Sequence, residues 1–200
     1  MTIYLIRHGE TDWNRELKIQ GQADIPLNEA GRAQARLAAE KMAGIPVDIA
    51  YTSPLKRSQE TAELFLAGRE NCPLHTNQLL KEISYGVREG QSLPLIYKCP
   101  LLRLHNYFQH PEKYIPPRGG ETIQELKARC RSFLEEEVYG CESRVSSMMI
   151  FTHGAFIKAA VSIVNQLPDR DFWAGAKTEN CSVTAMKLKD GRLSMLNSLE

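Results

Sequence analysis

The chain has 200 residues, of which 42% are hydrophobic and 24% are charged, and its formal net charge is +1. This composition is that of an ordinary globular protein, and the length predicts a single domain over residues 1–200. The near-zero net charge gives no global basic field, so we expect no nucleic-acid partner and no membrane surface as a partner. No run of about 18 apolar residues occurs, so no transmembrane helix is predicted.

The N-terminus and the cysteines indicate a cytoplasmic protein. A strand-like segment begins at once in "TIYLIRH", where a secretory signal peptide would have a basic region and then an apolar one. The five cysteines are widely spaced, and they include neither a CxxC pair nor the spacing of zinc ligands. We therefore expect reduced thiols in a cytoplasmic location.

The first third of the chain predicts two strands and two helices. Residues 3–6 form a continuous apolar run, which is typical of a strand buried on both faces. A helix is expected to begin after Asn28, a favourable N-cap residue, and to end near Gly44. A strand at 47–53 and a helix at about 54–67 follow, with the proline in the first turn of that helix. The apolar face predicted for the first helix consists of Ala33, Leu37, Ala38 and Met42.

The clearest helix signal is "ETIQELKARCRSFLEEEVYG", at residues 121–140. Thr122 and Glu125 have the spacing of a capping box, in which each residue bonds to the backbone of the other. Apolar residues recur at helical spacing and predict one buried stripe, made of Ile123, Leu126, Cys130, Phe133 and Leu134.

The remaining segments complete an α/β pattern. An apolar run at 148–151 predicts another strand buried on both faces, and a helix is expected at about 155–165. Two strands are predicted on either side of Asp190 and Gly191, which form a hairpin turn signal. The alternation favours an α/β fold: a three-layer sandwich with a mostly parallel central sheet flanked by helices, plus a C-terminal β-hairpin.

Residues 90–120 interrupt the alternation of strands and helices. Five prolines and a Gly-Gly pair punctuate this stretch. Because long irregular segments inside a compact domain are usually lids or binding segments, we predict a lid-like insertion here.

Basic side chains follow three of the predicted strands. Arg7 and His8 end the first strand, Arg57 follows the strand at 47–53, and His153 ends the strand at 148–151. A single histidine at a strand end is usually structural, and a single arginine in a first helical turn is usually a solvated charge. Their coincidence at one sheet edge, where α/β proteins bind ligands, favours a functional site.

A phosphoryl group is the ligand that best fits this set. Guanidinium groups match phosphate oxygens in a bidentate manner, and a helix that starts at Gly154 adds backbone N–H donors. A histidine with a free ring nitrogen can be the nucleophile of phosphoryl transfer. A metal site of two histidines and a carboxylate is the rival interpretation. The two nearby guanidinium groups and the lack of HxxxH spacing argue against it, so no metal ion is expected.

The order of motifs resembles that of a known family. The segments "LIRHGETDWN", "SPLKRSQETA", "KEISYGVREG" and "FTHGAFIK" are similar, in that order, to the signatures of the histidine phosphatase superfamily, phosphoglycerate mutase-like branch. The segments "GQADIPLNEAGRAQA" and "GGET" also resemble motifs of that family. The resemblance covers roughly residues 2–165.

The resemblance implies a role for each matching residue. His8 would be the nucleophile that becomes phosphohistidine, and Glu82 would be the general acid and base. It also implies that no metal ion or other cofactor is needed. The phosphate pocket would contain Arg7, Arg57 and His153, and further phosphate or substrate contacts would come from Asn14, Gln20, Gly21 and the backbone of Gly154.

Mutases and phosphatases both occur in this family. The compact length and the apolar Ala155 and Phe156 favour a phosphatase, because the glycolytic mutases are longer and often have a polar residue there. A mutase and a catalytically silent binding protein remain as alternatives. Phosphatase substrates in the family include sugar phosphates, phosphoserine, phosphoglycerates and α-ribazole phosphate. We expect a small-molecule phosphoester as the partner, and a homodimer stays open.

Substrate selection is expected to come from the insertion at 90–120. An arginine there would bind a carboxylate or a second phosphate of the substrate, whereas the aromatic residues could equally pin the insertion to the core. The main candidates are Tyr97, Arg103, Tyr114 and Arg118, and His105, Tyr107 and Phe108 are further ones.

Overall fold

The computed structural model describes residues 1–69, 71–175 and 177–196, without the side chain of Arg103. These residues contain a six-stranded sheet with the order β3-β2-β4-β1-β5-β6. The parallel strands are β1 (Thr2–Arg7), β2 (Ile49–Thr52), β3 (Leu74–Thr76) and β4 (Ser147–Thr152). Strand β5 (Val183–Lys189) pairs antiparallel with β1, and β6 (Arg192–Met195) pairs antiparallel with β5, so the two strands form the expected C-terminal hairpin.

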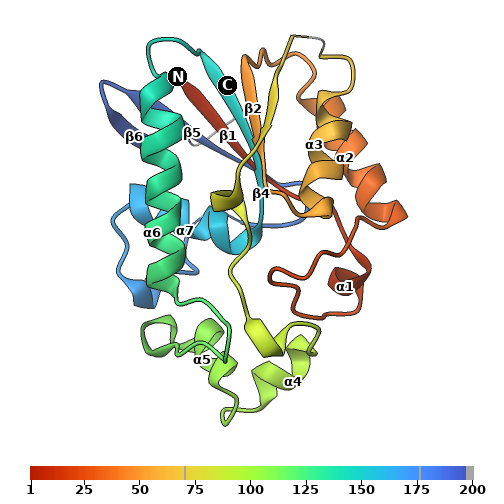
Figure 1. The fold of residues 1–200 in the computed structure, drawn as a ribbon, viewed down its shortest axis with the longest axis vertical. Helices are drawn as coiled ribbons and strands as arrows, with labels where there is room; N and C mark the ends of the chain where they lie inside the picture. The colour runs from red at the N-terminus through yellow and green to blue at the C-terminus, as the bar shows by residue number, and fades with distance from the viewer. Residues whose placement is uncertain (70, 176, 197–200) are drawn as a thin grey trace.

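Helices cover both faces of the sheet (Figure 1). On one side lie α2 (Glu29–Lys41) and α3 (Lys56–Leu66), and on the other lie α6 (Ile123–Phe133) and α7 (Gly154–Val164). The three-layer α/β sandwich with a mostly parallel sheet is therefore confirmed. Three shorter helices lie beyond the carboxyl edge of the sheet: α1 (Asp12–Arg15), α4 (Leu93–Lys98) and α5 (Arg103–Gln109).

Single turns of other helix types connect these elements. The 3₁₀ turns are Gln78–Leu80, Gly86–Arg88, Pro111–Lys113, Tyr139–Cys141 and Asp169–Asp171, and a π-helical turn, Leu134–Val138, continues α6. No helix among the described residues has the length and apolar composition needed to span a membrane.

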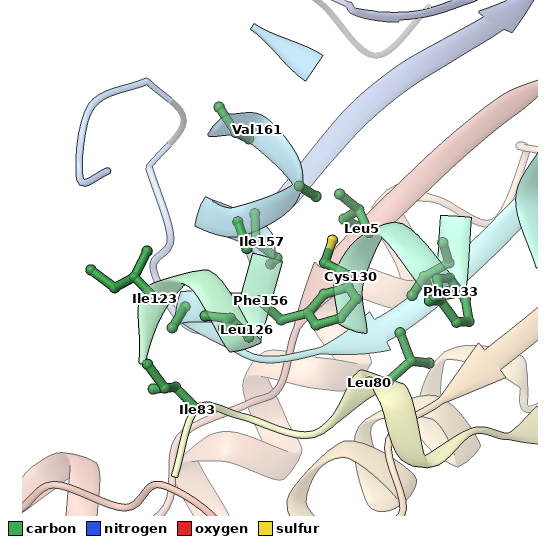
Figure 2. Packing of buried hydrophobic residues seen from close by; sticks show 14 of the residues in the cluster. Leu5, Leu80, Ile83, Ile123, Leu126, Cys130, Phe133, Phe156, Ile157 and Val161 are labelled. Atoms are coloured by element: carbon green, nitrogen blue, oxygen red, sulfur yellow. The ribbon is translucent and has the colours of Figure 1, made fainter. Parts of the chain in front are cut away.

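The central strands are apolar throughout because each face of the sheet has its own core. In β1, Ile3 and Leu5 belong to the core under α6 and α7, whereas Tyr4 and Ile6 belong to the core under α2 and α3. Strand β4 alternates in the same way between the two cores. Figure 2 shows the first core, in which Leu5 lies among side chains of α6 and α7. A buried central strand has no polar face, which explains the uninterrupted apolar runs.

The predicted cap of α6 is confirmed. The Thr122 Oγ1 accepts a hydrogen bond of 3.1 Å from the backbone N–H of Glu125, and the Glu125 carboxylate accepts one of 2.8 Å from the backbone N–H of Thr122. All five residues of the predicted stripe are buried. The sequence pattern therefore located both the start of this helix and its buried face.

The apolar face predicted for α2 was partly wrong. Leu37 is 55% exposed and Ala33 is also exposed, whereas Ala35 and Met42 are buried. The helix turns Gly31 inward, where an added Cβ atom would lie 2.0 Å from the backbone oxygen of Glu10. This close approach sets the rotation of the helix, and a count of apolar side chains cannot detect it.

The start of α3 and the number of strands also differ from the prediction. Pro54 lies outside α3, because Leu55 is the N-cap and the helix begins at Lys56. The sequence pattern also missed β3, whose three residues are all exposed at the sheet edge and therefore have no apolar alternation. The hairpin turn was located correctly: Asp190 and Gly191 both have positive φ angles, 52° and 71°, as a two-residue turn of this kind requires.

Candidate active site

A cavity of about 200 Å³ opens at the carboxyl edge of the sheet. It lies where residues that follow β1 and β4 meet residues of the 90–120 insertion. Its lining consists of Arg7, His8, Asn14, Lys18, Ile19, Gln20, Gly21, Arg57, Glu82, Tyr85, Leu93, Tyr97, Phe108, Gly154, Ala155, Trp173 and Thr178. Nearly all of the residues predicted to bind phosphate are therefore brought together.

The pairing of β1 with β4 brings the two predicted histidines together. Arg7 is in register with Thr152, and the backbone N–H of His8 donates to the carbonyl oxygen of Thr152 over 3.0 Å. The next residues along the two parallel strands are His8 and His153, whose ring centres lie 5.2 Å apart. Adjacent parallel strands thus place both imidazoles at one edge.

The His8 ring is held in one tautomer. Its Nδ1 lies 2.7 Å from the carbonyl oxygen of Gly9, which can only accept a hydrogen bond, so Nδ1 carries the hydrogen. Burial lowers the pKa of His8 well below its ordinary value, and the charges of Arg57 and Arg7 lower it further. At neutral pH the ring is therefore uncharged and Nε2 has a free electron pair, as a nucleophile requires.

Two guanidinium groups supply positive charge at the cavity, that of the buried Arg57 and that of the half-buried Arg7. Arg57 is 0% exposed and donates over 2.7 Å to the carbonyl oxygens of Ala23 and Gly21, and Arg7 donates to the carbonyl oxygen of Thr178. Within the described part of the chain, the Nε atoms of both arginines lack a hydrogen-bond partner. Burial lowers the pKa of Arg57 to about 10, which leaves it charged at neutral pH. Such donors suit an anionic ligand.

His153 lies at the site without lining the cavity itself. It is fully buried, and its Nε2 lies 2.8 Å from the Oγ of Ser53. Its Nδ1 is buried and has no partner among the described residues. Burial lowers the pKa of His153 well below its ordinary value, and Arg57 and His8 act in the same direction. A neutral imidazole that donates from one nitrogen is the expected state.

Glu82 is held at the N-terminus of α7. Its carboxylate accepts from the backbone N–H of Ile83 over 2.9 Å and from that of Ala155 over 3.3 Å. Burial raises the pKa of Glu82, although these N–H groups and the two arginines oppose the rise. A carboxyl group with a raised pKa beside a histidine with a lowered one is the combination that acid–base catalysis uses.

The other predicted contacts also line the cavity. Gly21 has a φ of +54°, which favours glycine, and Gln20 has a buried Oε1 without a partner among the described residues. The Oδ1 of Asn14 accepts a hydrogen bond of 3.2 Å from the backbone N–H of Thr11, the N-cap of α1, and another of 3.4 Å from Asn180. At Gly154 an added Cβ would lie 3.7 Å from the Nε of Arg7, so the start of α7 lies against that guanidinium.

The residues proposed for specificity divide into two groups. Tyr97 and Phe108 line the cavity, but Tyr114 and Arg118 do not. Tyr114 is only 8% exposed and packs 4.9 Å from the ring of Tyr107, so it pins the insertion to the core. Arg118 is exposed, and the side chain of Arg103 lies outside the described residues. His105 and Tyr107 are also absent from the cavity lining.

The segment after α7 contributes residues that the sequence pattern did not identify. Trp173 and Thr178 line the cavity, and the Nδ2 of Asn180 donates to the carbonyl oxygen of His8 over 3.0 Å. No motif marks this segment, and only the rarity of tryptophan could have drawn attention to it. Other lining residues not predicted are Lys18, Ile19, Tyr85, Leu93 and Ala155.

Among the described residues, no group of three or more His, Cys, Asp and Glu side chains is placed to hold a metal ion. The site combines two guanidinium groups, two neutral imidazoles, one carboxyl group and a helix N-terminus.

Fold and site together define an α/β protein with a cavity lined by two arginines beside a buried histidine pair. Residues 3–198 match the model of the histidine phosphatase superfamily, branch 1. The chain belongs to this superfamily, as its motifs implied. The phosphatase class expected from the sequence is confirmed at the level of the family.

Individual relatives agree with this membership. A probable phosphatase of Schizosaccharomyces pombe is 32% identical over 78% of this chain and 70% of its own length. Phosphoglycerate mutase-like protein 4 of Arabidopsis thaliana is 33% identical over 94% of this chain and 80% of its own. The solved structure of a mycobacterial glucosyl-3-phosphoglycerate phosphatase in complex with VO3 has a TM-score of 0.84 at 27% identity, over 97% of this chain and 96% of that one.

Proposed function

We propose that this chain hydrolyses a small phosphomonoester through a phosphohistidine at His8, without a metal ion. One observation carries the proposal: the Nδ1 of His8 bonds to the carbonyl oxygen of Gly9, which leaves a neutral Nε2 at a cavity lined by Arg7 and Arg57. An unprotonated ring nitrogen beside two fixed cations is what in-line attack on a phosphoryl group needs.

The proposed reaction has two steps. In the first, Nε2 of His8 bonds to phosphorus, the ester P–O bond breaks, and the protonated Glu82 gives its proton to the leaving oxygen. In the second, the Glu82 carboxylate takes a proton from water, whose oxygen attacks phosphorus as the P–N bond breaks. Inorganic phosphate is released, and Glu82 is protonated again.

The cationic groups have a role in both steps. Arg7, Arg57 and the backbone N–H of Gly154 would bind the phosphoryl oxygens and stabilise charge in the transition state. A bound dianion also opposes the effect of the two arginines on Glu82, which otherwise lower the pKa of its carboxyl group. We therefore expect Glu82 to become a better acid once substrate is bound.

Detection of the phosphoenzyme is the decisive test. Rapid quenching in alkaline detergent after mixing with a ³²P-labelled ester should reveal a label on His8 that is stable in base and is lost on acidification. The His8→Ala variant should lack both label and turnover, and excess chelator should leave turnover unchanged. Normal turnover by His8→Ala, or loss of activity in chelator, would contradict the proposal.

Transfer to water distinguishes the proposed hydrolase from a mutase. The amounts of inorganic phosphate and of alcohol released should be equal, whether or not the assay contains another alcohol that could accept the phosphoryl group. A phosphorylated acceptor formed in place of free phosphate would instead support the mutase alternative. We also propose a cytoplasmic location, which agrees with five cysteines that are all free thiols.

A further inference from the structure

Three aromatic side chains form one side of the cavity. Tyr97 comes from α4, Phe108 comes from α5, and Trp173 comes from the segment after α7. The ring centres of Tyr97 and Phe108 lie 4.9 Å apart, and those of Phe108 and Trp173 lie 5.6 Å apart with planes only 22° from parallel. These three rings are called the aromatic wall.

Trp173 is fixed in the wall by several independent contacts. Its indole Nε1 donates to the carbonyl oxygen of Tyr107 over 2.7 Å, so the one polar atom of the side chain is satisfied by protein. Its own carbonyl oxygen accepts a bond of 2.8 Å from Nζ of Lys158, which comes from α7. The ring of Tyr107 also packs edge-on against the indole. The indole therefore offers the cavity a preorganised apolar surface.

Other apolar groups continue this surface. Ile19 and Leu93 line the same cavity, which is also lined by the charged groups Arg7, Arg57 and Glu82. The cavity of about 200 Å³ is thus lined by both charged and apolar groups. A ligand that matches both kinds of lining combines one phosphoryl group with a compact apolar body.

We propose that the aromatic wall binds a planar, apolar ring of the substrate alcohol, so that ring-bearing phosphomonoesters are the preferred substrates. This inference rests on the proposed function. Stacking on flat side chains favours a planar group over a flexible polar chain, because the rings exclude water and prefer offset-stacked or edge contacts. Substrate specificity then depends on Trp173 as much as on the insertion at 90–120, whereas the sequence predicted that all specificity residues lie in the insertion.

Two substrates with similar leaving groups test the preference. Butyl phosphate and 2-(2-naphthyl)ethyl phosphate both release a primary alcohol, so their kcat/KM ratio reports binding of the ring more than leaving-group chemistry. We expect the naphthyl ester to be favoured by about 10-fold or more, the discrimination typical of a larger apolar group in a fitted pocket. Trp173→Leu and Phe108→Leu should each remove most of that ratio, because kcat/KM should fall more for the naphthyl ester than for butyl phosphate.

Matched variants and a binding measurement complete the test. Tyr139→Leu changes a side chain that is 38% exposed and does not line the cavity, so the ratio should not change. In Trp13→Phe, Trp173 is the only tryptophan of the chain. Its fluorescence should respond to 2-naphthylmethylphosphonate but not to methylphosphonate.

The outcomes separate the two proposals. A ratio near one in the unaltered protein, or an unchanged ratio in Trp173→Leu, overturns the role of the aromatic wall while hydrolysis persists. Absence of hydrolysis of both esters, with no phosphoenzyme, overturns the proposed function instead. In that case a fluorescence response specific to the naphthyl phosphonate would still support the aromatic wall as a binding surface.

Discussion

The Oγ of Ser53 lies 2.8 Å from the Nε2 of His153, and both side chains are fully buried. The same Oγ accepts a long hydrogen bond of 3.4 Å from the backbone N–H of Leu55. Among the described residues, the Nε2 of His153 is the acceptor found for the hydroxyl hydrogen of Ser53. Ser53 therefore donates to Nε2, which places the imidazole hydrogen on Nδ1. Ser53 thus holds His153 in the tautomer that can donate to a phosphoryl oxygen.

Ser53→Ala should lower kcat/KM by about 10-fold, because the loss of one buried hydrogen bond costs on the order of 1–3 kcal/mol. A purely structural role would leave the histidine tautomer unchanged, so ¹⁵N NMR of the His153 ring is the deciding measurement. Signals should indicate Nδ1–H in the unaltered protein and a mixture in Ser53→Ala. Ser53→Thr keeps the hydroxyl and should restore both properties, whereas a single Nδ1–H tautomer in Ser53→Ala would contradict the assignment.

Glu82→Gln should retain phosphate binding but slow turnover by about 100-fold or more, the usual contribution of general acid–base catalysis. The amide can still accept from the N–H of Ala155, but it cannot deliver a proton to the leaving oxygen. The loss should be greatest for alkyl esters and small for esters of acidic phenols, whose oxygen leaves without protonation. Equal rates for Glu82→Gln and the unaltered protein on an alkyl ester would exclude Glu82 as the acid.

Stability should decrease as the pH falls below about 6.5, the ordinary pKa of histidine. His8 and His153 have lowered pKa values in the folded state, so the unfolded chain takes up protons first and is favoured by acid. Each histidine adds up to about 1.4 kcal/mol per pH unit to the slope of unfolding free energy against pH. Urea unfolding at several pH values between 7 and 5.5 measures that slope.

The variant His153→Gln should have a shallower slope than the unaltered protein. Glu82 acts with the opposite sign, because its raised pKa makes the folded state hold a proton that the unfolded state has released. Its contribution is present in both proteins and cancels in the difference between them. An identical slope for the variant would show that His153 is not held neutral by the fold.

Sequence reasoning identified the charged residues of the cavity better than its aromatic residues. His8, Arg57 and His153 each follow a buried strand or begin a helix, so local patterns and the parallel sheet suffice to bring them together. Trp173 is held at the cavity by hydrogen bonds to α5 and α7. Its partner in α5 is 66 positions away in the chain, and its partner in α7 is 15 positions away. Such contacts have no local signature, and the role of the segment could not be predicted.

The same distinction applies to the fold. The capping box and apolar stripe of α6 are local features, and they were predicted correctly. The rotation of α2 depends on the backbone contact between Gly31 and Glu10, two segments that meet only in the folded chain. Apolar residues alone therefore gave a face for α2 that included Leu37, although this side chain is 55% exposed.

Met42 and Leu37 should consequently respond very differently to truncation. Met42 is 2% exposed and packs in the core between the sheet, α2 and α3, so Met42→Ala should lower the free energy of unfolding by about 2–5 kcal/mol. Leu37→Ala removes an exposed side chain and improves helix propensity, so its effect should stay within about 0.5 kcal/mol. Urea unfolding at pH 7 measures both changes, and Ala33→Ser serves as a second exposed control on the same helix. If Leu37→Ala were as destabilising as Met42→Ala, the helix would pack with the face that its apolar spacing suggested, and Gly31 would not set its rotation.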